Sequence, residues 1–525
     1  MKLTEIIFFY YCYRIIYTES AKILAVFPTQ SISHQVVFRP LMHELAARGH
    51  EVVVITPAPA YPAGGGPANL TEIDVRQYYG DIVFNLSTSV NEYDNIRTSI
   101  RRSISIGEKR FPGQLNTPTV QKIIRNKNTK FDLLIVEAWF APLLAFSHRF
   151  NVPVIRISSV GSFFPEYHVM DGFGHPLLYP PNLCSRCPNI ENLTFIEKIY
   201  EIYNYIYISD LFYCFEETEN VKLKAVFGSD MPSLSELSKN VHLHMSNVHR
   251  TWELNRPVPT SVIQVGGIHL KSECTLPEDL KKYLDSSVNG VLYISFGTNM
   301  KTSWLQAEKL DIMIKVLSSL PLDILWKWDE DELPVQTGNI KISKWLPQEC
   351  LLRHPKVKLF ITQGGLQSTE EAIAAGVPLV GIPMIADQFS NVQNYVRHRI
   401  GVKLMWNDFT EEEFRDAIYS VWKDESYRHN IIRFRDQLRD VQMQPLARAV
   451  WWTEYVLKYG GAMHLRAPAA NMHWAQYHEL DLLALLAAFV FLACFAVYIA
   501  IKILLRLIWR ICVKKVNFNE QKLKY

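Results

Sequence analysis

His34 and Glu137 are the two residues whose types and positions best fit acid–base chemistry. His34 follows the apolar stretch Lys22–Thr29 and stands at the start of a predicted helix, with Ser33 as its cap. Amides at a helix start disfavour a proton on a nearby imidazole, so this histidine is available as a general base. Glu137 follows a second apolar stretch, Phe131–Val136. Taken singly, His34 could be a surface or capping residue and Glu137 a solvated acid. If the two stretches are strands of one parallel sheet, their carboxyl ends converge, and the carboxylate can hold the imidazole as in a catalytic triad.

A second group of candidates lies in the segment Trp345–Gln388. Its predicted strand Lys358–Thr362 leads into Gln363-Gly364-Gly365, and a helix is predicted to start at Ser368. The glycines allow a ligand to approach the backbone, and the amides of a helix start suit a phosphate group. Two alternatives remain open here. Ser368 and Glu371 have the spacing of a capping box, and Trp345 could stack on a base or belong to the core.

The pattern around these residues predicts two doubly wound α/β domains that face one another, joined by a seam at Leu254–Pro259. Near-continuous apolar strands alternate with helical segments, which is typical of parallel sheets covered on both faces. Neither GxGxxG after a strand nor GxxxxGK[ST] occurs, so the sequence lacks a dinucleotide fingerprint and a P-loop. The other predicted strands are 51–56, 290–296, 324–327, 340–342 and 378–382, and the predicted helical segments are 35–48, 369–375 and 411–459.

The composition excludes several classes of protein. With 525 residues, 48% hydrophobic and 20% charged, the chain is too long for a small stapled module and too apolar for global disorder. The formal net charge of +3 is too small for a nucleic-acid binder, so no nucleic-acid partner is expected.

A membrane anchor is predicted near the carboxyl terminus. Residues 482–501 carry no charge and are long enough to span a bilayer as a helix, although a buried core helix is the alternative. Residues 502–525 contain seven basic residues and one acidic residue, so this basic tail is expected in the cytosol and the body on the opposite side. Residues 1–20 are accordingly interpreted as a signal peptide, with an apolar region at 6–13 and a cleavage site after Ser20.

The glycosylation sequons and the cysteines fit a translocated body. Sequons occur at Asn69, Asn85 and Asn192. An odd number of cysteines in the body argues against a disulfide framework, although Cys184 and Cys187 could pair locally, and no zinc-ligand spacing is evident. The five cysteines of the body are Cys184, Cys187, Cys214, Cys274 and Cys350.

Over nearly its whole length the sequence resembles the UDP-glycosyltransferases, in particular their membrane-bound animal branch, with an invertebrate-like character. The resemblance rests on 345–388 and on four shorter motifs: RGHE (48–51), AVFGSDMP (225–232), SFGT (295–298) and GAMHLR (461–466). It implies a GT-B fold. The acceptor-binding domain would be residues 21–255, and the UDP-sugar-binding domain with its closing helices would be residues 260–459.

The same resemblance implies a role for each site residue. His34 matches the base that deprotonates the acceptor, and Glu137 matches the acid that partners it. The implied donor-site residues are Trp345 and Gln348 for uracil, Thr298, Gln363, Gly365, Gln367 and Ser368 for the pyrophosphate, Glu371 for the ribose, and Asp387 and Gln388 for the sugar hydroxyls.

Two residues depart from the family pattern. Glu137 stands where Asp is usual, and one extra methylene would move the carboxylate by about 1.5 Å, enough to cost roughly 10²-fold in rate. Gln363 stands where His is usual, and losing a charge-assisted hydrogen bond to phosphate could cost about 1 kcal/mol.

The sequence therefore predicts an inverting transfer of a hexose, with glucose favoured, from a UDP-sugar to a hydroxyl of a small lipophilic acceptor. UDP-sugar is a co-substrate, and neither a cofactor nor a metal is expected. A non-catalytic binder or carrier of small apolar ligands is the alternative, and an enzyme that processes glycans is a third interpretation. The expected location is the endoplasmic reticulum membrane, as a single-pass type I glycoprotein with a role in detoxification, and a homo-oligomer is possible.

Overall fold

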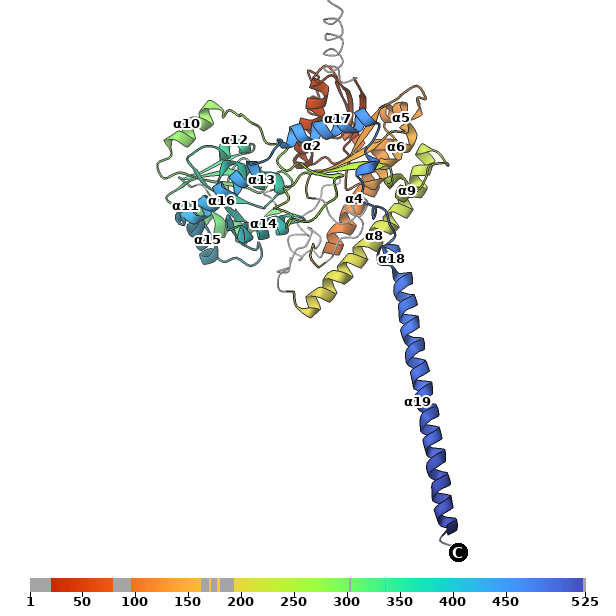
Figure 1. Cartoon of the computed structure of the whole chain (residues 1–525). Helices are drawn as coiled ribbons and strands as arrows, with labels where there is room; N and C mark the ends of the chain where they lie inside the picture. Colours follow the sequence, from red (N-terminus) through yellow and green to blue (C-terminus); the bar gives the residue numbers. More distant parts are fainter. Residues whose placement is uncertain are drawn as a thin grey trace, which may run out of the picture. The chain divides into compact units, whose positions relative to one another are not determined.

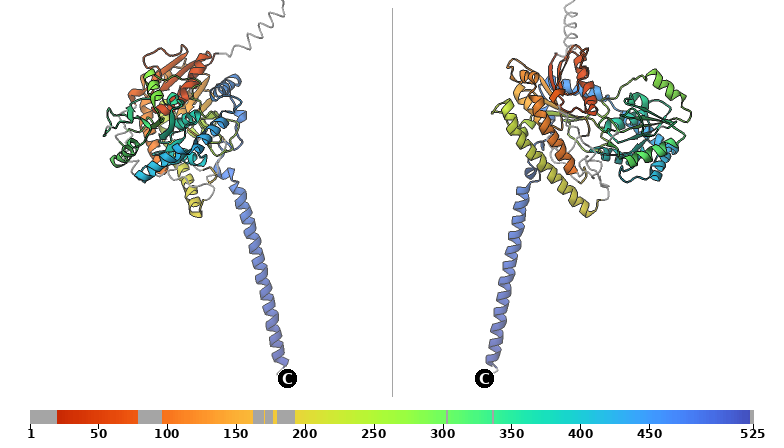
Figure 2. Two further views of the ribbon diagram at one scale, coloured as in Figure 1. Left: turned by 90° about the vertical axis from the view of Figure 1, so that its left-hand side faces the viewer. Right: turned by 180° about the vertical axis from the view of Figure 1, so that it is seen from behind.

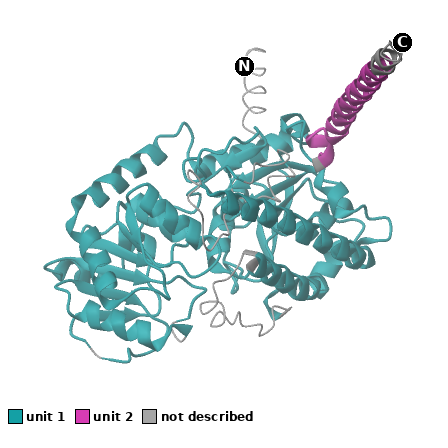
Figure 3. Ribbon diagram, turned by 90° about the horizontal axis from the view of Figure 1, so that it is seen from below, with its two compact units in different colours: residues 1–471 teal, residues 472–525 magenta. Residues whose placement is uncertain are grey.

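The structure is a computed structural model that describes residues 20–78, 96–161, 170, 177–179, 193–301, 304–335 and 337–522. The chain divides into two compact units, residues 1–471 and residues 472–525 (Figure 3). The predicted signal peptide before Ser20, the sequons at Asn85 and Asn192, and the cysteines Cys184 and Cys187 lie outside the described residues.

The first half of the larger unit is built on a parallel sheet, which has seven strands among the described residues. The strand order is β3-β2-β1-β4-β5-β6-β7. The order reverses between β1 and β4, which makes their carboxyl ends the topological switch point where ligands of such sheets bind. The strands are β1 (Lys22–Val26), β2 (Glu51–Thr56), β3 (Leu70–Asp74), β4 (Leu133–Glu137), β5 (Val154–Ser158), β6 (Val241–Ser246) and β7 (Val262–Gln264).

Helices cover both faces of this sheet because alternate strand residues point to opposite sides and nearly all are apolar. One face packs on α2 (Ile32–Ala47) and α17 (Pro445–Tyr459). The opposite face packs on the orange-to-yellow helices of Figure 1. These are α4 (Ile96–Leu115), α5 (Pro118–Arg125), α6 (Ala145–Phe150), α8 (Phe195–Phe227) and α9 (Leu234–Ser238), with 3-10 turns at Arg76–Tyr78 and Ala141–Leu144.

The second half is a parallel sheet of the same kind, with six strands among the described residues in the order β10-β9-β8-β11-β12-β13. Its switch point lies between β8 and β11. The strands are β8 (Val291–Ser295), β9 (Asp323–Lys327), β10 (Ile340–Ser343), β11 (Val357–Thr362), β12 (Leu379–Gly381) and β13 (Gly401–Lys403).

The second sheet is also covered on both faces (Figure 2). Helices α11 (Ala307–Ser318) and α15 (Glu411–Lys423) contribute the core of one face. The core of the other face contains residues of α10 (Glu278–Ser286), α12 (Gln348–Leu352), α13 (Leu366–Ala375), α14 (Gln388–Arg397) and α16 (Glu425–Arg439).

The two predicted domains are present, but their boundaries differ from the prediction. Strand β7 follows the predicted seam at Leu254–Pro259 and still belongs to the first sheet. Helix α17, expected to close the second domain, packs on α2 instead, and Glu454 forms an ion pair with Arg48 at 2.6 Å. The apolar face of α17 completes the first core, so the chain returns to the first half after finishing the second.

The smaller unit contains the predicted anchor. It holds α18 (Trp474–Tyr477) and α19 (Leu480–Lys522), and a short 3-10 turn at Met463–Leu465 precedes it in the chain. Within α19, residues 480–514 are long and apolar enough to cross a membrane by length and composition, with a mean hydropathy of 2.8 and none of the apolar window buried. The helix therefore extends beyond the predicted span of 482–501 into the basic tail.

Candidate active site

The predicted acid–base pair meets at the switch point of the first sheet. His34 lies in the first turn of α2, directly after β1, and Glu137 is the last residue of β4. The Nδ1 atom of His34 lies 2.7 Å from Oε1 of Glu137, whose side chain is fully buried. Because Nδ1 is engaged by the carboxylate, Nε2 is the ring nitrogen left to accept a proton.

The helix that carries His34 starts earlier than predicted. Its cap is Ser31, not Ser33, and the amide of His34 donates to the carbonyl of Ser31 at 3.0 Å. The side chain of Ser33 instead contacts the hydroxyl of Ser31 at 2.8 Å. Although the cap differs, the first turn still presents the imidazole at the carboxyl edge of the sheet.

The extra methylene of Glu137 does not separate the acid from the histidine. The second carboxylate oxygen, Oε2, lies within 3.3 Å of the backbone amide of Thr29, which follows β1. This second contact helps to hold the carboxylate of Glu137 in place beside His34. The expected displacement of about 1.5 Å therefore does not break the contact between the carboxylate and His34.

Ser159 is a member of this site that sequence reasoning missed. Its hydroxyl lies 2.9 Å from Nδ1 of His34, and its carbonyl accepts from Asn247 at 3.2 Å and from Gln367 at 2.6 Å. Ser159 follows β5 and Asn247 follows β6. The rule that identified Glu137, a polar residue at the carboxyl end of a parallel strand, could have identified both.

The second site lies at the switch point of the other sheet. Helix α13 begins at Leu366 with Gly365 as its cap, so the prediction of a start at Ser368 is wrong. The first helical bond runs from Thr369 to Gly365, which leaves the amides of 366–368 without helical partners and able to bind an anion. Gly365 has an ordinary φ of −60°, and a Cβ there would meet only Gln363, at 3.9 Å.

Glu371 forms no capping box, because Ser368 lies inside the helix. Its Oε2 accepts from Nε2 of Gln348 at 2.7 Å, and the same Nε2 lies 2.9 Å from Oγ of Ser368. Oε1 of Gln348 accepts from the hydroxyl of Tyr293 at 3.0 Å. Burial raises the pKa of Glu371 to about 7. Gln348, predicted to bind uracil, and Glu371, predicted to bind ribose, thus belong to one connected group.

The remaining donor-site candidates also face this region. Trp345 is 62% exposed, which rules out the core alternative, and Thr298 is exposed on the loop after β8. Asp387 accepts from Asn391 at 2.8 Å, and burial raises the pKa of its carboxyl. Oε1 of Gln388 accepts from the amides of residues 384 and 385, at 2.9 Å each. Within the described part of the chain, Oε1 of Gln363 is buried without a hydrogen-bond partner.

One cleft of about 1680 Å³ is lined by both halves. All the predicted site residues except Glu137 line it, and Glu137 lies behind the imidazole of His34. The volume exceeds the roughly 300–1,000 Å³ of a typical small-molecule pocket, so the cleft has room for a nucleotide sugar and an acceptor together.

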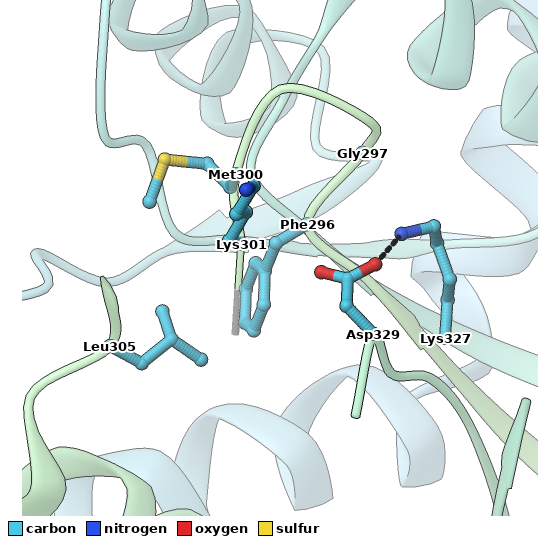
Figure 4. A pocket seen from close by; sticks show the side chains of 7 residues that line it. All are labelled: Phe296, Gly297, Met300, Lys301, Leu305, Lys327 and Asp329. Atoms are coloured by element: carbon cyan, nitrogen blue, oxygen red, sulfur yellow. Dashed lines mark hydrogen bonds and ion pairs between the residues drawn. The ribbon is translucent and has the colours of Figure 1, made fainter. Parts of the chain in front are cut away.

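A second hollow shares Gly297 and Lys327 with this cleft (Figure 4). Its volume is only about 10 Å³, room for a single water molecule, and Lys327 pairs with Asp329 beside it at 2.7 Å. The hollow is too small for a substrate. In the described ranges, no cluster of three or more His, Cys, Asp or Glu side chains is placed to hold a metal ion.

Several contacts join the two halves around the cleft. Asn247 donates to Glu370 at 3.2 Å, and Trp252 donates to Asn391 at 2.9 Å. Asn391 in turn donates to the carbonyl of Gly364 at 2.9 Å. These residues, also missed by sequence reasoning, connect the loops after β6 to the donor side. The arrangement brings the imidazole of His34 and the start of α13 to one cleft.

The fold is that of the GT-B glycosyltransferases. The structure of Arabidopsis thaliana UGT89C1 complexed with UDP-L-rhamnose matches with a TM-score of 0.57 at 15% identity, covering 84% of this chain and all of that one. At this identity the likeness establishes the fold alone.

Sequence comparison identifies the family. The family described as UDP-glucoronosyl and UDP-glucosyl transferase matches residues 21–517, so the chain belongs to the UDP-glycosyltransferases. A UDP-glycosyltransferase, UGT5, of Dactylopius coccus is 33% identical over 500 residues, 93% of each chain. The ecdysteroid UDP-glucosyltransferase of Lymantria dispar multicapsid nuclear polyhedrosis virus is 35% identical, covering 89% of this chain and 93% of its own. The chain is therefore a UDP-sugar-dependent glycosyltransferase.

Proposed function

We propose that this enzyme transfers a hexose, with glucose favoured, from its UDP-sugar to a hydroxyl group of a small lipophilic acceptor, with inversion at the anomeric carbon. The observation that carries the proposal is the single cleft lined by His34 on one side and by the start of α13 on the other. The preference for glucose is supported by relatives named UDP-glucosyltransferases.

In the proposed mechanism, Nε2 of His34 takes the proton of the acceptor hydroxyl as its oxygen attacks the anomeric carbon. Glu137 holds Nδ1 and stabilises the imidazolium that forms, by the logic of a triad. The C–O bond to UDP breaks on the opposite face of the sugar. The free amides of 366–368, with the side chains of Thr298, Gln363 and Ser368, take up the charge that develops on the diphosphate. No metal is assigned a role.

The donor would lie along the second half of the cleft. Exposed Trp345 would stack on the uracil with Gln348 beside it, and Glu371 would accept from the ribose hydroxyls. Asp387 and Gln388 would contact the sugar hydroxyls, and Gln367 would contact the pyrophosphate. Gln348 and Glu371 now bond one another, so nucleotide binding would exchange some of these contacts for its own.

The acceptor is proposed to be a polycyclic or phenolic alcohol. Relatives named ecdysteroid UDP-glucosyltransferases favour a steroid hydroxyl. The apolar helix α19 supports an acceptor that partitions into a membrane. The same helix and its basic tail support anchoring in the endoplasmic reticulum membrane, with the tail in the cytosol and the body lumenal.

Replacing His34 tests the proposal. His34→Ala should lower transfer from UDP-glucose to a sterol or phenol panel by about 10²–10⁴-fold, because the general base is lost. UDP binding, measured by isothermal titration calorimetry, should stay within about twofold, because the donor contacts lie elsewhere. His429→Ala, which removes an exposed histidine outside the cleft, is the control. Full activity of His34→Ala would refute the assignment, and no transfer by the wild type to any acceptor would favour the binder.

A further inference from the structure

The segment 265–274, here called the strap, connects the first sheet to the second half of the molecule. Its beginning is fixed in the first half: the amide of Val265 donates to the carbonyl of Ser246 at 2.8 Å, and Ile268 is buried in the core. Gly266 passes so close to the backbone of 248–249 that a Cβ there would lie 2.6 Å from it. The first part of the strap is therefore held rigidly against the first half.

The end of the strap is fastened to α12, the short helix of the donor site. The amide of Lys271 donates to Oε1 of Glu349 at 2.7 Å. Arg353 donates to the carbonyls of Lys271 and Ser272, and it also pairs with Glu349 at 2.6 Å. Both faces of this contact are polar, and the side chains of Glu349 and Arg353 are 11% and 27% exposed.

A disulfide adds a covalent link at the same place. Cys274 of the strap is bonded to Cys350 of α12, with their Cα atoms 5.6 Å apart and a sequence separation of 76. The odd cysteine count argued against a disulfide framework and left only a local Cys184–Cys187 pair open, so this long-range pair was not predicted. An odd count excludes only complete pairing, and a contact between residues 76 positions apart is decided by the fold.

The disulfide lies close to Gln348, one of the predicted donor-site residues. Cys350 lies two residues after Gln348, which bonds Tyr293, Ser368 and Glu371. Because α12 has only five residues, a shift of Cys350 would move Gln348 directly. Glu349 and Cys350 line the cleft together with Gln348, and so do strap residues 265–274 in part, among them His269 and Lys271.

We propose that the strap and its Cys274–Cys350 disulfide are positioning elements of the UDP-sugar site. They hold α12 so that Gln348 and Glu371 are already arranged for the uridine part of the donor. Both cysteines act through Gln348 and touch no reacting atom, so they should set donor affinity and leave the chemical step alone. The inference rests on the proposed donor site, and it adds a redox dependence that the transfer reaction does not require.

The Cys274–Cys350 disulfide is reduced by thiol–disulfide exchange. A dithiol such as dithiothreitol gives two electrons and two protons to the S–S bond, which becomes two thiols, and the dithiol closes to a cyclic disulfide. After reduction, α12 keeps the hydrogen bonds of Glu349 and Arg353 and the core packing of Leu351 and Leu352, but it loses its covalent link to the strap. A pocket that adopts its binding-competent conformation for only a fraction of the time binds its ligand with an affinity reduced by that fraction.

Titration with UDP tests the proposal on the full-length enzyme in detergent. The double variant Cys274→Ser/Cys350→Ser should bind UDP about tenfold more weakly than the wild type and show a similar rise in KM for UDP-glucose. Its kcat and its KM for the acceptor should change less than about twofold, a split that general destabilisation would not produce. Dithiothreitol should weaken UDP binding of the wild type to the same degree and leave the double variant unchanged. Cys214→Ser, which replaces an exposed free cysteine, is the matched control.

Glu349→Gln provides a second variant that keeps the disulfide. Introduced into the wild type, Glu349→Gln should weaken UDP binding modestly, and introduced into the double variant it should weaken binding more strongly. The reason is that the hydrogen bonds of Glu349 and the disulfide both hold α12. Equal UDP affinity of the wild type, the reduced wild type and the double variant would overturn the proposal. Failure of the wild type to bind UDP at all would instead overturn the proposed donor site, so the two failures are distinguishable.

Discussion

At the scale of single residues, the contact between His34 and Glu137 shows that a side chain and its backbone position must match. The resemblance led us to expect Asp at this position, yet Oε1 of Glu137 lies 2.7 Å from Nδ1. The carboxylate also receives the amide of Thr29. Glu137 is therefore long enough to contact both His34 and the amide of Thr29.

Glu137→Asp should impair the enzyme although it restores the usual residue of the family. Shortening the side chain by about 1.5 Å withdraws the carboxylate from Nδ1, and kcat should fall about 10- to 100-fold. The KM for UDP-glucose should be unchanged, because the donor contacts are in the other half. Glu51→Asp, the same change at an exposed strand end, is the control. Steady-state kinetics measure this change in kcat. An equal or faster rate for Glu137→Asp would show that the length of a glutamate side chain is not needed to reach His34.

At the scale of elements, α13 carries proposed donor-site residues and also joins the two halves. Gln367 donates to the carbonyl of Ser159, next to the base, and Glu370 accepts from Asn247 of the first half. His269 lies nearby, with Nδ1 3.5 Å from Glu370 and Nε2 3.8 Å from Glu371. Burial raises the pKa of Glu370 to about 8 and lowers that of His269 to about 4. The interface is thus held together by largely neutral side chains near pH 7.

The raised pKa of Glu370 predicts a pH-dependent stability. Between the unfolded pKa of about 4.3 and the folded pKa of about 8, the folded state retains a proton that the unfolded state has lost. The contribution of Glu370 to the free energy of unfolding is fully present below its unfolded pKa. It is lost as the pH rises through its folded pKa, by at most about 1.4 kcal/mol per pH unit.

Glu370→Gln removes this titration and keeps an oxygen that can accept from Asn247. The melting temperature of the variant should therefore rise relative to that of the wild type as pH increases from 6 to about 8, by a few degrees, and then level off. Differential scanning fluorimetry across this range measures the difference. Glu278→Gln, at an exposed position on α10, serves as the control. If the melting temperatures of Glu370→Gln and the wild type changed in parallel with pH, the prediction would be contradicted.

At the scale of the whole molecule, the cleft and the long apolar helix belong to separate units. Both sheets and the cleft lie within residues 1–471, and the apolar stretch lies within residues 472–525. Helix α17 packs on the first sheet, so the larger unit completes both of its cores before the smaller unit begins.

A chain that ends after Asn471 should therefore keep its UDP affinity within about twofold and pass from the membrane pellet to the aqueous fraction. The apolar helix is not needed for the cores, and its burial in lipid supplies the membrane affinity. Ultracentrifugation and calorimetry with UDP check the two expectations, with the full-length chain as reference. A truncated chain that remains in the pellet while folded would reveal a further membrane contact in the larger unit.

The sequence and its family resemblance were sufficient for the two-sheet architecture, and all predicted site residues except Glu137 line the cleft. Continuous apolar strands such as Glu51–Thr56 and Val357–Thr362 are unmistakable because both faces of a parallel sheet are buried. The resemblance to the UDP-glycosyltransferases is confirmed, and so is the GT-B fold. The predicted helix starts were wrong by two to three residues, because both Ser31 and Ser33, and both Gly365 and Ser368, are acceptable residues at a helix N-terminus.

Only the tertiary structure decided which distant residues meet. Strand β7 and helix α17 join the first sheet through apolar faces that would fit either core, so local pattern could not assign them. The pairing of Cys274 with Cys350, the contact of Ser159 with His34 and the link from Asn247 to Glu370 all join residues far apart in sequence. Periodicity and caps are local properties, which the sequence determines. Long-range partners depend on how two sheets are set against each other, and that arrangement exists only in the folded chain.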